Sequence, residues 1–176
     1  VLQTKSVELA MKNNLPLQVL SSITNLTGTM IVNEGDIMEK ELVSGVSYSN
    51  NEAKVTISGV PDVPGIAAII FGVLSDNNIS VDMIVQNISQ DGIKANLTFT
   101  VQANDMKLAK EIIEEHKSSV NYVSLSTNAD VSKISVIGVG MNSQSGVAKK
   151  MFQTLASKEI NILAISTSEI KISVLI

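Results

Sequence analysis

Two segments of this 176-residue chain resemble each other closely enough to indicate an internal duplication. The first begins at Lys54 and the second at Lys133, and each reads as a strand, a glycine-containing loop, a helix and a strand. Five matched pairs share one offset of 81 positions: Gly65 with Gly146, Phe71 with Phe152, Leu74 with Leu155, Ile79 with Ile160, and Val81 with Ile162. Chance matches would not keep one offset, so the chain must fold as two related units.

The first copy contains six expected elements in the order βαββαβ. Residues 55–60 alternate as a strand, and the helix after it carries an apolar stripe of Ile66, Ile69, Ile70, Val73 and Leu74. Further strands are expected over 79–88 and 97–101, a second helix after Asp105, and a fourth strand over 120–125. This order predicts an α+β fold of two ferredoxin-like units in tandem, each with an antiparallel sheet and helices on one face.

The second copy stops after its third strand. Strands over 134–139, 160–167 and 170–176 and one helix are expected, but the second helix and the fourth strand are absent. We therefore expect the natural protein to continue past Ile176. Either that continuation or the N-terminal strand in LPLQVLSS would complete the second sheet.

The first fifty residues match neither copy. A short helix over 5–13 and two short strands, in LPLQVLSS and GTMIV, are expected there, and the polar stretch over 34–51 reads as a linker. The predicted domains are a linker region over 1–50, a first repeat unit over 51–128 and a second, truncated unit over 129–176.

Composition disfavours several functional classes. All thirteen basic residues are Lys, the net charge is −4 and aromatic residues make up 3%, so nucleic-acid binding is not expected. No apolar run reaches the length of a membrane helix, and the lack of Cys removes disulfides, thiolate metal sites and cysteine nucleophiles. We expect a cytoplasmic protein without a membrane partner, and the single His116 reads as a solvated helix residue.

Ligand binding is better supported than catalysis. There is no GxxxxGK[ST] phosphate loop and no nucleophile paired with a base. In both copies a strand leads into a glycine loop that opens a helix, where free N–H groups favour an anion such as an α-carboxylate. Asp62 can pair with an α-ammonium group, and Gln86 and Asn161 can add amide contacts. The alternative is that Asp62 or Val63 only caps a helix beginning at Pro64.

The tandem strand, D-x-PG loop, helix and strand resemble ACT domains, small modules that sense amino acids. The segments VELAMKNNLPLQVLSS, GTMIV, VDMIVQNIS and ISTSEIKISVLI resemble the C-terminal regulatory region of aspartate kinases, over essentially the whole chain. The resemblance implies binding of lysine, threonine or both as feedback inhibitors at interfaces between ACT domains. It also implies a homodimer and contact with the kinase domain of the parent chain.

The resemblance further implies that this region is inactive alone and needs no cofactor. ATP and Mg²⁺ would serve the kinase domain, which phosphorylates L-aspartate in the first step of lysine, threonine and methionine biosynthesis. Three alternatives remain: an ACT pair from another amino-acid enzyme or regulator, a separately made small subunit, and a ferredoxin-like RNA-binding or metal-carrying module.

Two effector sites are implied by position. The first would comprise Asp62, Gly65, Ala67, Ser80, Val81, Asp82 and Gln86, with Asn161 and Ile162 from the second copy. The second would comprise Ser143, Val147, Ala148, Ser166 and Ser168. In the second loop, NSQSG departs from the family pattern because Ser145 stands where several relatives have Pro.

Overall fold

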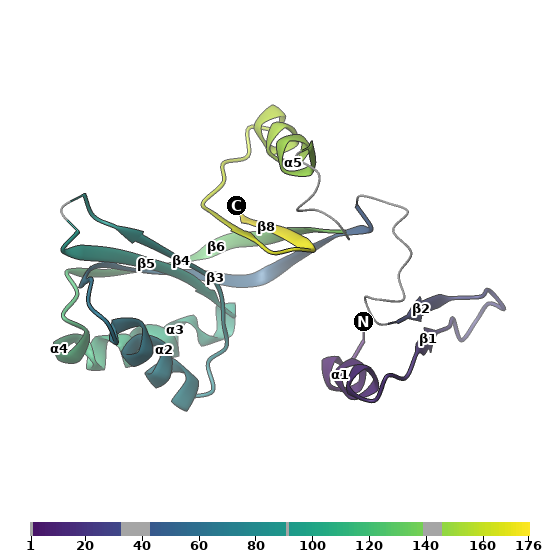
Figure 1. Ribbon diagram of the computed structural model, residues 1–176, viewed down its shortest axis with the longest axis horizontal. Coiled ribbons are helices and arrows are strands. Elements are labelled where there is room, and N and C mark those ends of the chain that lie inside the picture. Colours follow the sequence, from purple (N-terminus) through teal and green to yellow (C-terminus); the bar gives the residue numbers. More distant parts are fainter. Residues whose placement is uncertain (1, 33–42, 91, 139–145) are drawn as a thin grey trace. The chain divides into compact units, whose positions relative to one another are not determined.

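The computed structural model describes residues 2–32, 43–90, 92–138 and 146–176 (Figure 1). The chain divides into two compact units, Val1–Lys40 and Glu41–Ile176. The first unit contains the expected helix, α1 (Thr4–Lys12), and the two expected strands, β1 (Leu17–Val19) and β2 (Thr29–Ile31). These strands pair with each other in an antiparallel sheet of their own, so the idea that LPLQVLSS completes the second repeat is wrong.

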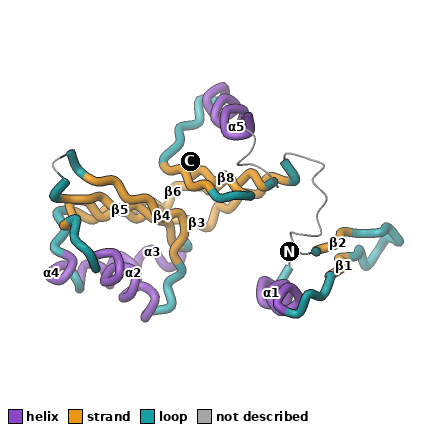
Figure 2. Tube along the Cα trace, viewed as in Figure 1, coloured by secondary structure: helices purple, strands orange, loops and turns teal. Residues whose placement is uncertain are grey.

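The second unit is built on one six-stranded antiparallel sheet with the order β4-β5-β3-β6-β8-β7. Figure 2 shows these strands together with the helices that cover them. In chain order the elements are β3 (Gly45–Pro61), α2 (Ile66–Asp76), β4 (Val81–Ile88), β5 (Lys94–Val101), the 3₁₀ turn η2 (Ala103–Asp105), α3 (Met106–Glu115), α4 (Lys117–Val120), β6 (Ser124–Ile137), α5 (Gly146–Ser157), β7 (Ala164–Thr167) and β8 (Lys171–Leu175).

The first copy has the predicted ferredoxin-like order, with β4, β5, β3 and β6 side by side and α2 and α3 packed together. Its core includes Ile57, Ile70, Leu74 and Phe99, all fully buried. The strand predicted over 120–125 is wrong at its start. Residues 117–120 form α4 instead, and the left-handed backbone of Asn121 (φ 53°) ends that helix before β6 begins.

The second copy is completed by a segment that precedes the first copy in the chain. Residues 45–49 of β3 pair antiparallel with the end of β6, from Gly45 opposite Ile137 to Ser49 opposite Lys133. The prediction of a linker over 34–51 is therefore wrong for residues 45–51, while 33–42 lie outside the described residues. The predicted domain boundaries after residues 50 and 128 both fall inside continuous strands, β3 and β6.

The C-terminal strand β8 is buried on both faces. Ile172 and Val174 pack in a second core with Val136, Met151 and Leu155 from β6 and α5. Ser173 and Leu175, on the opposite face, are also buried. The run that ends the chain is therefore a central strand, paired with β6 on one side and β7 on the other.

The two copies meet at irregular points in the long strands. The β3–β6 register shifts on both sides of Glu52, and the β4–β5 register shifts between Asp82 and Val85. Figure 1 shows α2, α3 and α4 on one side of the strands and α5 on the other. A small cluster of Met83, Val131 and Leu175 joins strands of the two copies.

Candidate functional site

The loop between β3 and α2 places three predicted residues, Asp62, Gly65 and Ala67, at the start of the first helix. Helix α2 begins at Ile66, after Gly65 in a left-handed conformation (φ 98°) that only glycine adopts freely. A helix starting at Pro64 with an Asp62 or Val63 cap is therefore wrong. No side chain caps α2, so its first N–H groups have no side-chain acceptor.

Asp62 and Gln86 are brought together across the loop and the edge strand β4. The Gln86 Nε2 group donates a hydrogen bond to Asp62 Oδ1 at 3.3 Å, and the Asp62 backbone N–H donates to the Ile93 carbonyl at 3.0 Å. The carboxylate is thereby held beside the uncapped helix. The first N–H groups of α2 can bind an anion, and the neighbouring Asp62 carboxylate can bind an ammonium group. This combination suits a zwitterionic ligand.

Ser80 is exposed just before β4, and Val81 packs against the first core.

Asp82 belongs to a different cluster from Asp62. Its Oδ2 accepts a hydrogen bond from Lys133 Nζ at 2.9 Å, and its Oδ1 accepts the Met83 N–H at 2.8 Å. Lys133 Nζ also lies 2.6 Å from Glu52 Oε1, and we call these three side chains the junction triad. Each carboxylate oxygen of Asp82 thus accepts a hydrogen bond from within the fold.

The junction triad changes the pKa values of two of its members. Burial alone would raise the pKa of Asp82, but the hydrogen bonds from Lys133 and the Met83 N–H outweigh it and lower that pKa. Burial alone would lower the pKa of Lys133, but the hydrogen bonds to Glu52 and Asp82 outweigh it and raise that pKa. The pair is therefore charged at neutral pH.

Glu52 and Lys133 were missed by sequence reasoning. Glu52 alternates with the buried Ala53 and Val55 in β3, which ordinarily indicates a solvent-facing position. The one feature in the sequence that could have indicated this pair is that a charged residue, Glu52 or Lys133, precedes the apolar strand that begins each copy. Their burial depends on the packing of two distant strands, which local alternation cannot reveal.

Asn161 lies away from the Asp62–Gln86 pair. It lines a cavity of about 390 Å³ with Asp130, Val131 and Ser132 of β6 and with Ile160, Leu163 and Ile176. Val131 pairs with Glu52, whereas Asp62 follows the far end of β3, roughly 30 Å away at about 3.3 Å per residue. Ile162 packs into the second core. Within one chain Asn161 is therefore remote from Asp62, whereas the Asp82 end of β4 lies on the Val131 side, because Met83 packs against Val131.

The residues predicted for a second site are not gathered in one place. Val147 lines an apolar cavity of about 660 Å³ beneath α5, with Lys150 as its one charged lining residue among those described, and Ala148 packs on the second core. Ser166 lies on β7, and Ser168 lies in the β7–β8 turn, where its N–H donates to the Lys171 carbonyl at 2.8 Å. Ser143 lies outside the described residues.

The described ranges contain neither a metal-binding cluster nor a membrane-spanning helix. No group of three or more His, Cys, Asp or Glu side chains in them could hold a metal ion. Likewise, none of the helices in these ranges combines the length and the apolar character needed to cross a bilayer.

Comparison with known proteins agrees with this geometry. Residues 55–116 and 134–176 match the family model of the ACT domain. The aspartate kinase of Pseudomonas fluorescens is 46% identical over 177 residues, covering 100% of this chain and 43% of that relative. The chain thus spans less than half the length of that relative.

The solved structures that resemble this chain include three from aspartate kinases. A structure of aspartokinase alpha and beta subunits has 45% identity and a TM-score of 0.69, over 76% of this chain and 86% of that one. The ligand-free regulatory subunit of aspartate kinase from Thermus thermophilus has 36% identity and a TM-score of 0.72, over 77% and 88%. Escherichia coli aspartokinase III, in complex with lysine and aspartate, has 22% identity and a TM-score of 0.72, over 100% and 38%, a likeness of fold alone.

The match to the ACT domain model covers more than half of the chain, and the regulatory subunit from Thermus thermophilus is matched over 88% of its own length. The chain therefore belongs to the ACT domain family, as a regulatory region of the aspartate kinase type.

Proposed function

We propose that this chain is the amino-acid-sensing region of an aspartate kinase and binds lysine, threonine or both as feedback inhibitors. The observation that carries the proposal is the pairing of Asp62 with Gln86 beside the uncapped start of α2. The helix N–H groups would receive the α-carboxylate of the effector, and Asp62 would receive its α-ammonium group. Gln86 would hold the Asp62 carboxylate in place.

We propose that a second copy of the chain completes this site. Asn161 and Ile162 are separated from Asp62 within one chain, so their predicted contribution requires an interface between two ACT regions. The position of β4 supports such pairing, because the strand that carries Gln86 lies at the end of the sheet and pairs only with β5 among the described strands. The effector would then lie between two chains and bind the homodimer more tightly than the monomer.

The whole protein would transfer the γ-phosphoryl group of ATP to the side-chain carboxylate of L-aspartate, with Mg²⁺, to give 4-phospho-L-aspartate and ADP. That chemistry would belong to a kinase domain of the parent chain, and we expect this region alone to be inactive and cytoplasmic. An effector that binds only one packing of the ACT pair shifts the kinase towards its inactive arrangement. Aspartate or ATP should then weaken effector binding by the same factor.

Titration calorimetry of the 176-residue chain with lysine, threonine and their mixture tests the proposal. We expect saturable heat for at least one of the three, lost in Asp62→Asn because the amide no longer attracts an ammonium group. Asp76→Asn is the matched control, since Asp76 is exposed at the opposite end of α2. The absence of heat with all three ligands would overturn the effector assignment.

A further inference from the structure

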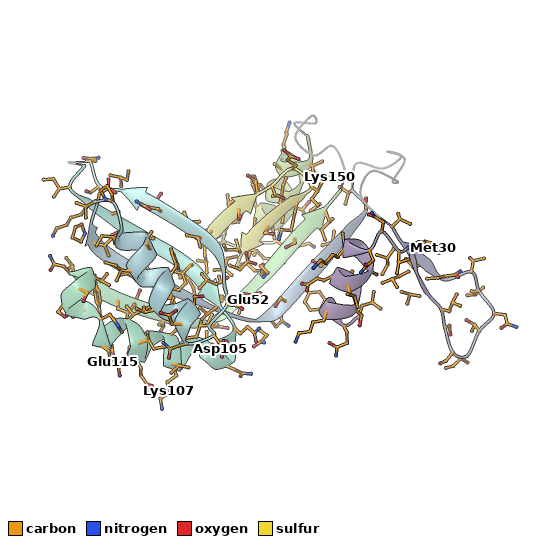
Figure 3. All side chains as sticks on the ribbon, turned by 60° about the horizontal axis from the view of Figure 1, so that its bottom comes forward. Met30, Glu52, Asp105, Lys107, Glu115 and Lys150 are labelled. Carbon is orange, nitrogen blue, oxygen red and sulfur yellow. The ribbon has the colours of Figure 1, made fainter. Side chains whose placement is uncertain are left out.

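The junction triad lies where the two copies share their strands. Glu52 sits at the double register shift of β3, Lys133 begins the second-copy part of β6, and Asp82 lies on the edge strand of the first copy. Figure 3 labels Glu52 where the strands of the two copies meet. Lys133 Nζ is within 3 Å of both carboxylates, so one ammonium group ties three strands together.

The buried carboxylate of Glu52 depends on the Lys133 ammonium group for its charge partner. Its side chain is only 9% exposed and that of Lys133 only 19%, whereas Asp82 is 54% exposed. A buried carboxylate without a cation is strongly unfavourable, and among the described residues Lys133 alone forms an ion pair with Glu52. The position of Lys133 is thus determined by Glu52, and Asp82 is the more easily displaced partner.

Asp82 also holds a strained bulge that points into the second copy. Met83 has a left-handed backbone (φ 49°), which is unfavourable for a residue with a Cβ atom. Its N–H donates to Asp82 Oδ1, and its side chain, 3% exposed, packs on Val131 and Leu175. The same carboxylate therefore binds Lys133 through one oxygen and fixes the Met83 bulge through the other.

We propose that Lys133 is a positioning residue that couples the two ACT copies by holding the Asp82–Met83 bulge of β4 against the strands of the second copy. A displacement of β4, the strand that also carries Gln86, then changes the packing of Met83 on Leu175 in β8. The inference rests on the proposed regulatory role but not on the identity of the effector. It also assigns Asp82 to the junction rather than to ligand contact.

Hydrogen exchange in the ligand-free 176-residue chain tests this coupling. Asp82→Asn lies in the first copy and keeps the Glu52–Lys133 pair, so it is expected to fold. We expect it to speed exchange of β7 and β8 amides about 2- to 5-fold, as for loss of a partly exposed ion pair. The increase in β7 and β8 should exceed that in α3, which is in the same copy as Asp82. An increase confined to β4 and β5 would overturn the proposal.

Two further variants separate coupling from general stability. Lys133→Met should speed β7 and β8 exchange by at least about 100-fold, because Glu52 loses its partner, and Lys133→Arg should restore most of the protection. Lys107→Met is the matched control, since Lys107 is 87% exposed on α3 and points away from the sheet (Figure 3). An effect of Lys107→Met on β7 and β8 equal to that of Asp82→Asn would also overturn the proposal. No ligand is used, so failure of lysine and threonine to bind leaves this test intact.

Discussion

Asn78 and Glu159 adopt nearly the same left-handed backbone conformation, with φ of 58° and 56°, at positions 81 residues apart. In both copies the residue that follows closes the helix end in the same way. The Ile79 N–H donates to the Leu74 carbonyl at 3.0 Å, and the Ile160 N–H donates to the Leu155 carbonyl at 3.0 Å. The duplication is therefore preserved in the hydrogen bonds that end the helix, although the side chain at this position differs.

Replacing Glu159 by asparagine should stabilise the protein. A left-handed conformation costs most L-residues about 1–2 kcal/mol, and Asn tolerates it better than Glu, so we expect a gain of about 0.5–1 kcal/mol. Urea unfolding measures it, and Asn78→Glu in the first copy should lose a similar amount. A destabilised Glu159→Asn variant would contradict this account.

Replacement by alanine should change the stability of the protein in opposite directions at two glycines of the first copy. A Cβ at Gly59 (φ 71°) would lie 2.5 Å from Val123 Cγ2, so Gly59→Ala should destabilise by at least about 1–2 kcal/mol. At Gly72, inside α2, a Cβ meets nothing within 4 Å, so Gly72→Ala should stabilise by about 0.5–1 kcal/mol. Thermal unfolding of both variants checks the pair, and equal shifts in Tm would be inconsistent with it.

Ser135 and Ser173 should show strong non-additivity. Their hydroxyl oxygens are 2.7 Å apart and both residues are buried between β6 and β8. Each single change to alanine leaves the other hydroxyl unpaired and should cost about 1–3 kcal/mol, whereas the double change should cost clearly less than the sum. Denaturant unfolding of the double-mutant cycle gives the coupling energy, and simple additivity would refute the pairing.

The Asp82–Lys133 contact should make stability depend on pH at both extremes. Because the pKa of Asp82 is lowered in the folded protein, Asp82 contributes to the free energy of unfolding above its ordinary pKa of 3.8. This contribution is lost as the pH falls through the pKa of Asp82 in the folded protein. Because the pKa of Lys133 is raised in the folded protein, Lys133 contributes to the free energy of unfolding below its ordinary pKa of 10.5. This contribution is lost as the pH rises through the pKa of Lys133 in the folded protein.

Asp82→Asn provides the comparison for this pH dependence. The difference in unfolding free energy between wild type and variant should be constant through neutral pH and shrink below pH 3.8. Because Asp82 is half exposed, we expect a difference of less than about 1 kcal/mol. A difference that grows as the pH falls would have the wrong sign for a lowered pKa.

Most of the first copy could be predicted from local patterns. The stripe in α2 correctly placed Ile70 and Leu74 in the core, because helix periodicity depends only on neighbouring residues. Ile69 in the same stripe is partly exposed. The loop position of Asp62 and the strand position of Gln86 followed from the same patterns, and the structure places their side chains in contact.

The joining of the two copies could not be predicted in the same way. Residues 45–49 place Val46 and Tyr48 on one face, but the segment is short, follows the polar stretch from Glu34, and both side chains are exposed, so its pairing with the end of β6 was not expected. The partner of Glu52 is likewise Lys133, on a strand beyond the whole first copy. Neighbouring residues in the sequence do not reveal which distant strand a segment pairs with. The sequence therefore suggested a linker where the structure has β3, a strand shared by the two copies.

The pairing of Gly45 with Ile137 means that the first copy is inserted into the second. During synthesis, residues 45–49 leave the ribosome long before their β6 partner exists, and must wait while the inserted copy is made. Once that copy folds, it brings the two ends together and removes most of the entropy cost of closing so long a loop. The first copy would then act as a template for the second, and a mutation that slows its folding should delay both.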